Sequence, residues 1–349
     1  MGLPQIIINF RTAGSSAVRR SARGQAVLLA EGEKAELYSF SEAEQAESAG
    51  LAEDCRRLLR LCFLGGPAKV LLYLYPKGEE AAALARCAPA AEGGWLCAPQ
   101  MDAQTVTAFV KSKRAEGRPL RAVVSSETGP DCAGIVNLTT QGITVLLEGK
   151  TESVDTADYC ARIAGILAGL SLRESATYYS LPEVTGFVSS QDEEADIAAG
   201  RLILDQGSEG ARIARAVTSL TTLSQPGDSA FQKIKIAEGV DLIRADIRSV
   251  FESEYVGKVL NDYDSKLLLV TAINSYFAGL EGSVLDTGRR NTASVDFAAQ
   301  KRWLEGRGVD TAALSDTAIL SANTGSQVFL RANLRFADAM EDLTFEISM

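Results

Sequence analysis

Two stretches, "DSAFQKIKIAEGVDLIRADIRSVFESEYVGK" (228–258) and "DSKLLLVTAINSYFAGLEG" (264–282), follow one another in the second half of this 349-residue chain. The first stretch predicts a long amphipathic helix, because apolar residues recur in it at helical spacing among charged ones. These are Ile234, Ile243, Ile247 and Val250. The second predicts another helix that ends at Gly279 or Gly282. A third helix is predicted within "SVDFAAQKRWLEGRG" (294–308).

A different pattern precedes these helices, between residues 24 and 150, where apolar strand-like runs alternate with helical stretches. The predicted strands are "GQAVLLA", "AKVLLYLYP", "GGWLCAP", "PLRAVVSS", "GIVNLTT" and "GITVLLEG". The first helical stretch begins with Ser41 and Glu44, which fit a capping box, and stops at Gly65 and Gly66. Strands separated by helices of this length imply βαβ units with a parallel or mixed sheet.

A further helix is predicted in "TADYCARIAGILAGLSLRES" (156–175), with small residues on one face that suit close packing. These are Ala161, Ala164, Gly165 and Ala168. The chain then ends in "QVFLRANLRFADAMEDLTFEISM" (327–349), which contains two strand patterns separated by "ADAMED". In the second pattern apolar residues alternate with polar ones; the apolar set is Leu343, Phe345 and Ile347.

The predicted fold class is therefore α/β, or α+β for the whole chain, in four parts. Residues 1–23 form an arm with an apolar run followed by four arginines and no acid, and 24–205 form an α/β body. Residues 206–342 form a domain of helices and a sheet, and 343–349 form a terminal strand arm.

Composition restricts the functions that the chain can have. The net charge of −10 argues against a general nucleic-acid binder. No stretch approaches the ~20 apolar residues that a membrane-crossing helix needs, and we expect no signal peptide. The six cysteines include no Cys-x-x-Cys pair and predict buried thiols in a reducing compartment. The chain has no histidine, which removes histidine-based catalysis and metal ligation.

Sequence motifs for phosphate binding, metal binding or catalysis are weak throughout the chain. Gly129 and Gly134 have phosphate-loop spacing after a strand, but Ile135 and Val136 stand where Lys and Ser or Thr are needed. The acidic clusters "QDEEAD" (191–196) and "NDYD" (261–264) lack the spacing of a calcium loop and are typical of helix starts. We therefore predict no catalytic residue, no cofactor and no metal.

The two ends of the chain are more informative. The N-terminal arm is basic beyond its apolar run, whereas the last twelve residues carry four acids and no base, and unlike charges favour pairing across strands. Burying an apolar side chain contributes about 1.5–3 kcal/mol, whereas ordering each backbone residue costs about 1–2 kcal/mol. For a single terminal strand, the free energy gained by burial nearly equals the free energy lost by ordering the backbone. Two alternatives stay open: an edge strand within its own chain, or a strand added to a neighbouring copy.

Three long stretches carry a family resemblance: "ARIAGILAGLSLRESATYYSLPEV" (161–184), "GARIARAVTSLTT" (210–222) and "FQKIKIAEGVDLIRADIRSVFESEYVGKVLNDYDSKLLLVTAINSYFAGLEG" (231–282). With the strand-rich ending, they closely resemble contractile tail sheath proteins of myophage-like tails and phage-tail-like bacteriocins. The resemblance covers about half of the chain, chiefly from residue 160 onward. Residues 24–150 resemble these proteins only in being α/β.

The resemblance implies a structural subunit rather than an enzyme, which stacks as hexameric rings around an inner tail tube and contracts to drive that tube through a cell envelope. The body would lie outside and the C-terminal domain would face the tube. Partners would be other copies, the tube protein, and baseplate and terminator proteins, with no nucleic acid and no membrane insertion. The protein would reside in a virion tail or tail-like particle, assembled in the bacterial cytoplasm.

The resemblance also implies roles for particular residues. Both arms would donate strands to neighbouring subunits through Ile6, Ile7, Ile8, Phe10, Leu343, Phe345 and Ile347. The recipient strand would lie in 328–336, with one apolar face made by Val328, Leu330, Ala332, Leu334 and Phe336. Candidate tube-facing residues are Lys233, Lys235, Arg244 and Arg248.

Two other interpretations of the function stay open. The first is a cytosolic α/β enzyme or ligand-binding protein without a recognisable active-site motif, which predicts a saturable small-molecule ligand and a monomer or small closed oligomer. The second is another virion protein, such as a tube or baseplate component, which the helix-rich segment 231–282 disfavours.

Overall fold

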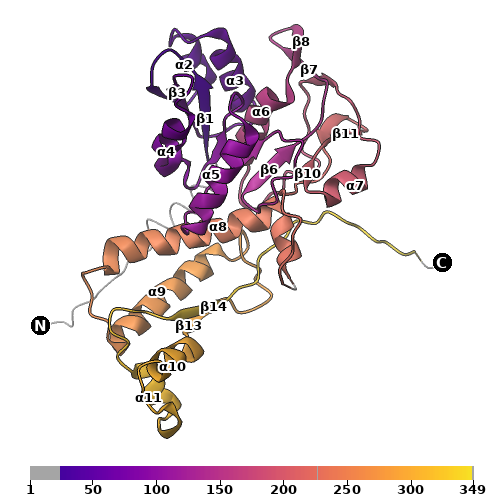
Figure 1. The fold of residues 1–349 in the computed structure, drawn as a ribbon. Coiled ribbons are helices and arrows are strands. Elements are labelled where there is room, and N and C mark those ends of the chain that lie inside the picture. The colour runs from indigo at the N-terminus through magenta and orange to yellow at the C-terminus, as the bar shows by residue number, and fades with distance from the viewer. Residues whose placement is uncertain (1–23, 226, 348–349) are drawn as a thin grey trace, which may run out of the picture. The chain divides into compact units, whose positions relative to one another are not determined.

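The computed structural model describes residues 24–225 and 227–347, and these form two compact units. The body unit comprises residues 24–245 together with 338–347, and the C-terminal unit comprises Asp246–Ala337. The predicted boundary at 205/206 therefore lies inside the body unit, which extends 40 residues further and also includes the segment before the C-terminal arm. The two units, each traced in Figure 1, are described separately below.

A seven-stranded sheet in the order β10-β6-β5-β4-β1-β3-β2 is the centre of the body unit. All of its pairings are parallel except that of the edge strand β2 with β3. The α/β prediction is confirmed. The strands are β1 (Gln25–Glu31), β2 (Glu36–Phe40), β3 (Lys69–Tyr75), β4 (Trp95–Cys97), β5 (Ala122–Val124), β6 (Ile135–Leu138) and β10 (Arg201–Leu202).

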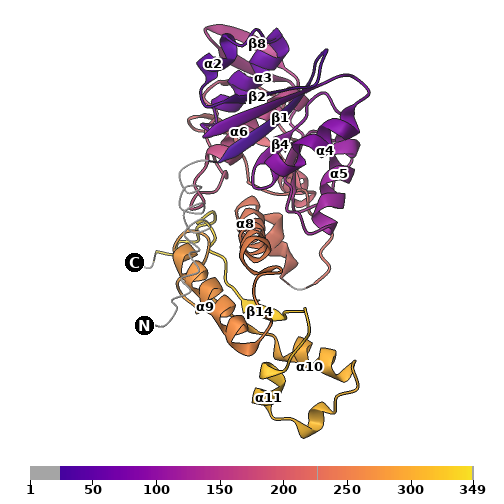
Figure 2. The same ribbon diagram turned by 90° about the vertical axis from the view of Figure 1, so that its left-hand side faces the viewer.

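Helices cover both faces of this sheet, as βαβ connections require. On one face lie α3 (Glu53–Phe63) and α6 (Thr156–Gly169), and on the other lie α4 (Glu80–Ala91) and α5 (Ala103–Ala115). Figure 2 shows the two helix pairs on opposite sides of β1 and β4. The central strand β1 supplies side chains alternately to both cores, which explains its continuous apolar sequence.

The small-residue face predicted on the helix at 156–175 is confirmed at Gly165. A Cβ atom there would lie 1.9 Å from the carbonyl oxygen of Cys62, and one on Gly169 would lie 1.9 Å from that of Gly65. Helices α3 and α6 therefore approach so closely that only glycine fits at these points.

The predicted capping box at Ser41 is wrong. A short helix, α2 (Ala43–Glu47), has Glu42 rather than Ser41 as its N-cap residue, and Glu42 makes no side-chain cap hydrogen bond. Gln45, rather than Glu44, accepts the hydrogen bond from the Ser41 backbone N–H at 2.9 Å. Gly50, with φ of 66°, then separates α2 from α3. The single helix expected over 41–64 is thus two helices.

Smaller elements complete the body unit. A three-stranded sheet has the order β8-β7-β9, and β11 pairs with β12 as a hairpin. Their bounds are β7 (Ile143–Leu147), β8 (Lys150–Val154), β9 (Val184–Gly186), α7 (Glu193–Ala198), β11 (Leu204–Gly207) and β12 (Gly210–Ile213).

The long helix predicted over 228–258 is interrupted at both ends. It begins as a 3₁₀ turn (Asp228–Gln232), continues as α8 (Ile234–Val250) and ends in a π-helical turn (Phe251–Tyr255). The first part of α8 belongs to the body unit, where the Asp241 carboxylate forms a two-pronged ion pair with Arg114 of α5 at 2.6 and 2.9 Å. This buried pair explains why the body unit extends beyond residue 205.

The C-terminal unit packs one helix against a two-stranded sheet of β13 (Thr292–Val295) and β14 (Leu330–Asn333). Asn274 on α9 (Tyr263–Leu280) bonds to both backbone groups of Ala293, at 2.6 and 3.2 Å, and so attaches the helix to β13. The connection between the strands contains α10 (Phe297–Glu305), a 3₁₀ turn (Thr311–Ala313) and α11 (Asp316–Ser321).

Candidate assembly surfaces

The C-terminal arm, residues 343–347 of the described chain, carries no helix or strand. Its three apolar side chains are almost fully exposed, at 89% for Leu343, 75% for Phe345 and 74% for Ile347. The strand pattern predicted here therefore has no ladder partner among the described residues, and the alternative of an edge strand within the same chain is not realised there. The N-terminal arm, with Ile6, Ile7, Ile8 and Phe10, lies outside the described residues.

Just before the arm, Glu341 is held in a polar socket of the body unit. Its Oε1 atom accepts hydrogen bonds from the hydroxyls of Ser175 at 2.9 Å and Thr177 at 2.7 Å. Its Oε2 atom lies 3.4 Å from both Arg215 and Lys233. Only 7% of the Glu341 side chain is exposed. Glu341 is therefore held in place by these contacts, whereas the apolar side chains that follow it are exposed.

Two further ion pairs flank the Glu341 socket. Arg215 also pairs with Asp342 at 2.5 Å, and Lys233 with Asp338 at 2.6 Å. The hydrogen bond to Asp342 raises the pKa of Arg215. Burial lowers the pKa of Lys233, but its hydrogen bond to Asp338 and the charge of Glu341 outweigh that effect and raise it overall. Both bases thus stay charged and hold the segment 338–342.

The four candidate tube-facing residues are divided between the two units, and their contacts differ. Lys233 is engaged with Asp338 and Glu341, and Lys235 donates to the carbonyl of Leu172 at 2.5 Å, so both contact their own body unit. Burial lowers the pKa of Lys235. Arg244 is exposed, and Arg248 pairs with Glu252 at 2.7 Å on the other side of the unit boundary. A tube-facing role for these residues stays a prediction.

The predicted recipient strand coincides with β14, which is shorter than the proposed 328–336. Its partner β13 occupies one edge, and Phe336 bridges to Leu285 further along. No strand pairs with the second edge of β14 among the residues of the described C-terminal unit. The apolar face is only half covered: Val328, Leu330, Leu334 and Phe336 are partly exposed, and Ala332 is exposed. Whether this edge receives a strand stays a prediction.

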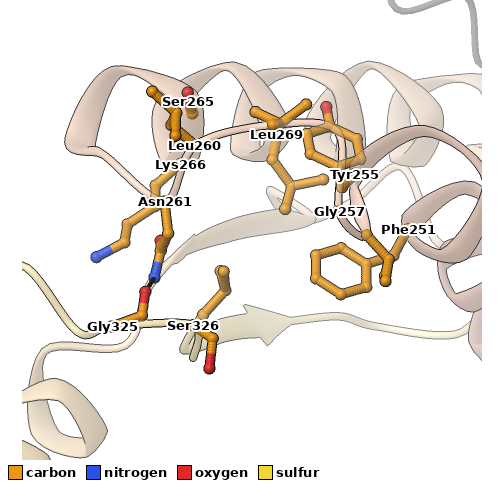
Figure 3. A pocket seen from close by; sticks show the side chains of 13 residues that line it. Phe251, Tyr255, Gly257, Leu260, Asn261, Ser265, Lys266, Leu269, Gly325 and Ser326 are labelled. Carbon is orange, nitrogen blue, oxygen red and sulfur yellow. Dashed lines mark hydrogen bonds between the residues drawn. The ribbon is translucent and has the colours of Figure 1, made fainter.

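An apolar pocket opens beside the start of β14, with a volume of about 500 Å³. Figure 3 shows Phe251, Tyr255 and Leu269 on one side of it, opposite Gly325 and Ser326. The rings of Phe251 and Tyr255 stack with centroids 5.9 Å apart. Burial raises the pKa of Tyr255. No sequence pattern indicates this pocket, because its walls come from segments up to 77 residues apart that meet only through tertiary packing.

The two acidic clusters serve as helix starts, as predicted. Asp192 caps α7 by accepting from the backbone N–H of Ala195 at 2.9 Å, and Asp262 caps α9 by accepting from that of Ser265 at 2.8 Å. Within the described ranges, no group of three or more Cys, Asp or Glu side chains is arranged to hold a metal ion. All six cysteines are buried free thiols, as predicted, whereas the reducing compartment stays a prediction.

In the stretch with phosphate-loop spacing, Ile135 and Val136 are buried residues of β6. Of the helices in the described chain, none combines the length and apolar character that a bilayer crossing requires.

Comparison with known proteins agrees with the fold. Residues 227–349 match the family described as "Phage tail sheath C-terminal domain". A tail sheath protein of Clostridium phage phiCD119 is 29% identical over 362 residues, which cover 100% of this chain and 99% of that protein.

Among solved structures, the sheath tail protein Lin1278 from Listeria innocua superposes with a TM-score of 0.68 at 17% identity, over 85% of this chain and 94% of its own. The helical sheath of the anti-feeding prophage in its contracted state has a TM-score of 0.65 at 14% identity, over 94% of this chain and 93% of its own. The resemblance found in the sequence is confirmed, and it extends over residues 24–150, for which the sequence indicated only the α/β class. The chain is therefore similar over its whole length to a phage tail sheath protein, and its residues 227–349 match the phage tail sheath C-terminal domain.

Proposed function

We propose that this chain is the sheath subunit of a contractile tail. Copies polymerise as stacked hexameric rings around an inner tube, and the resulting helical sheath contracts to drive the tube through a target cell envelope. The full-length similarity to a phage tail sheath protein supports this function. The proposed location is a virion tail or a phage-tail-like particle, with assembly in the bacterial cytoplasm.

The single observation that carries the proposal is the state of the C-terminal arm. Leu343, Phe345 and Ile347 alternate along the chain and are each at least 74% exposed, at a point where Glu341 is buried and fixed. An arm of this kind is a donor of a β-strand to another sheet, since main-chain hydrogen bonds give affinity and alternate side chains enter pockets. The free edge of β14 is the matching acceptor.

The action is mechanical rather than chemical. Each joint between an arm and a sheet is weak by itself, but many identical joints in one lattice act together and make the lattice stable. The extended sheath is the metastable lattice, and a trigger at the baseplate releases it to a shorter, wider one. The free energy is stored in assembly, so the subunit is not an enzyme and needs no nucleotide.

The remaining assignments form part of the same proposal. The body, predicted as 24–205, lies outside, and the C-terminal domain, predicted as 206–342, faces the tube. The N-terminal arm around Ile6–Phe10 is a second strand donor. Besides other copies, the partners are the tube, baseplate and terminator proteins.

Electron microscopy of the purified full chain tests this function. The wild type should form rings, tubes or contracted polysheath, and a chain that stops after Asp342 should remain monomeric. Two matched variants show whether the apolar side chains of the arm are needed for assembly. The triple variant Leu343→Ser, Phe345→Ser and Ile347→Ser should not assemble. The double variant Thr344→Ser and Glu346→Gln, which changes only polar residues of the arm, should assemble as the wild type does. A strictly monomeric wild type at high concentration, or assembly unaffected by the truncation, would overturn the proposal. A saturable small-molecule ligand on such a monomer would favour the ligand-binding alternative.

A further inference from the structure

The Glu341 socket is built by the body unit alone, from three segments that lie far apart in the sequence. Ser175 and Thr177 follow helix α6, Arg215 follows strand β12, and Lys233 precedes helix α8. These residues direct two hydroxyls and two positively charged groups at one carboxylate. Donors that converge in this way form a binding site for a carboxylate, because hydrogen bonds to an ionised acceptor are strong.

The donors of the socket are oriented by contacts that do not involve Glu341. The Thr177 hydroxyl accepts a hydrogen bond from the backbone N–H of Ala216 at 3.0 Å, which leaves its own hydrogen to point at the carboxylate. The Ser175 hydroxyl accepts from the backbone N–H of Thr177 at 3.2 Å. Lys233 forms an antiparallel bridge with Val217. The backbone of the body unit therefore holds the site in place.

The backbone beside these hydroxyls adopts an uncommon conformation. Tyr178 has a φ of 59°, in the left-handed region that residues other than glycine rarely adopt. Tyr178 is 56% exposed, so burial of its ring does not explain this conformation. Its backbone N–H donates to the carbonyl of Ile213 at 2.8 Å, which ties the hydroxyl segment to the segment that carries Arg215. Strain of this kind persists where the surrounding structure fixes a required geometry.

The socket holds the root of the arm and leaves the arm itself accessible. Its contacts and the two flanking ion pairs involve Asp338, Glu341 and Asp342. The three apolar side chains that follow are each at least 74% exposed. A contact that kept the arm from its partner would cover these side chains. The arrangement therefore indicates that the socket positions the arm rather than inhibits it.

Without the socket, the arm would begin further back along the chain. The residue held just before this segment is Ala337, whose backbone N–H donates to the carbonyl of Val284 at 2.9 Å. Phe345, in the middle of the arm, lies four residues beyond Glu341 but eight residues beyond Ala337. The effective concentration of a tethered group falls roughly as the −3/2 power of the tether length, so this doubling lowers it about threefold.

We propose that Glu341 is the positioning residue of the C-terminal arm: bound in its socket, it shortens the free tether and lowers the protein concentration at which subunits assemble. Glu341 acts through the arm that follows it and not by contact with a neighbouring copy. This inference rests on the proposed sheath function, since it names what determines the strength of one joint in that assembly.

The critical concentration for assembly of the full chain, measured by sedimentation and checked by electron microscopy, tests the inference. The socket variant combines Asp338→Asn, Glu341→Ala and Asp342→Asn, which removes every charge that holds the root of the arm. Its critical concentration should rise about threefold, because each added subunit closes its joint from a longer tether.

A matched control removes three charges from exposed acids of the body unit that lie outside the socket. It combines Glu44→Ala, Glu79→Gln and Glu209→Gln. This control changes the net charge as the socket variant does, so its critical concentration should equal that of the wild type.

An insertion variant distinguishes tether length from damage to the body unit. Gly-Ser-Gly-Ser placed between Asp342 and Leu343 keeps the socket but lengthens the tether from Glu341 to Phe345 from four to eight residues. It should raise the critical concentration by the same factor, about threefold, while the thermal midpoint stays that of the wild type. An unchanged or lower critical concentration in the socket variant, or an unchanged one in the insertion variant, would overturn the inference.

The wild type in the same experiment separates this inference from the proposed function. A wild type that assembles, with a socket variant that assembles at the same concentration, contradicts the role of Glu341 alone. A wild type that stays monomeric at every concentration contradicts both.

Discussion

The hydroxyl of Thr177 donates a 2.7 Å hydrogen bond to the Glu341 carboxylate, which joins residues 164 positions apart in the sequence. Ser175, Arg215 and Lys233 complete the socket around the same carboxylate. The socket fixes the point from which the C-terminal arm leaves the body unit. In the proposed sheath, this fixed origin would keep the arm in position while the lattice rearranges.

Glu341→Ala should loosen this origin without unfolding the protein. The substitution removes one charged acceptor from the half-buried hydroxyls of Ser175 and Thr177 and from two half-buried bases, which costs about 1–3 kcal/mol. The ion pairs of Arg215 with Asp342 and of Lys233 with Asp338 remain. We expect amide hydrogen exchange of residues 338–342 to become faster, while the thermal midpoint of the body unit changes little. Glu346→Ala, in the exposed arm, is the control and should leave this exchange unchanged.

The same substitution at two glycines should have opposite effects. Gly165→Ala forces a methyl group into the carbonyl of Cys62, and overpacking of this kind costs about 1–3 kcal/mol or more. Gly279→Ala in α9 meets nothing within 4 Å and should stabilise its helix by up to about 1 kcal/mol. Urea unfolding of the two variants measures this difference. A neutral Gly165→Ala would contradict the close approach of α3 and α6.

Acid should weaken one particular loop contact. Hydrogen bonds from the side chain and backbone of Thr222, and from the backbone of Thr221, hold the pKa of Asp131 well below its usual range. Because the folded pKa lies below the unfolded value of about 3.9, the stabilisation is present above that pH and is lost as the pH falls through the folded pKa. Asp131→Asn should therefore lower the urea midpoint at pH 7, and its difference from the wild type should shrink below about pH 4. Glu127→Gln, an exposed neighbour, should show no such convergence.

Removal of one partner of the ion pair between Arg114 and Asp241 should cost more stability than removal of one partner of a surface pair. The Asp241 side chain is 3% exposed, and removal of one member of a buried pair typically costs about 3–5 kcal/mol. Asp241→Asn should thus destabilise the body unit severely in a urea titration. Glu252→Gln, which removes the exposed pair with Arg248, should cost less than about 1 kcal/mol. Similar losses in the two variants would contradict the role of Asp241 in anchoring α8.

Much of the body unit follows from local sequence. Buried parallel strands such as β1 and β3 are continuous apolar runs in the sequence. The distance between such runs along the chain predicts the helices that connect them. The prediction failed at Ser41 because Gln45, rather than the expected Glu44, bonds the Ser41 backbone, and at 251–255 because a π-helical turn leaves no clear periodic signal. Both errors concern ends of helices, where short-range contacts compete.

The assembly surfaces were only partly visible in the sequence. Alternation predicted the arm at Leu343, Phe345 and Ile347, but a pattern does not show whether a strand finds its partner in the same chain. Lys233 was assigned to a surface by its charge, whereas the fold brings it to Asp338 and Glu341, more than 100 residues away. The pocket at Tyr255 could not be predicted, because it exists only where helix, turn and loop residues from distant parts of the chain meet.

The most direct test of the account is a cryo-EM reconstruction of the assembled sheath, in which the path of residues 338–349 is traced from each subunit. The account predicts that the arm crosses to a neighbouring subunit and pairs with the free edge of β14 there, with Leu343, Phe345 and Ile347 buried against that neighbour. An ordered sheath in which the arm stays on its own subunit, or in which the edge of β14 is unpaired, would contradict it.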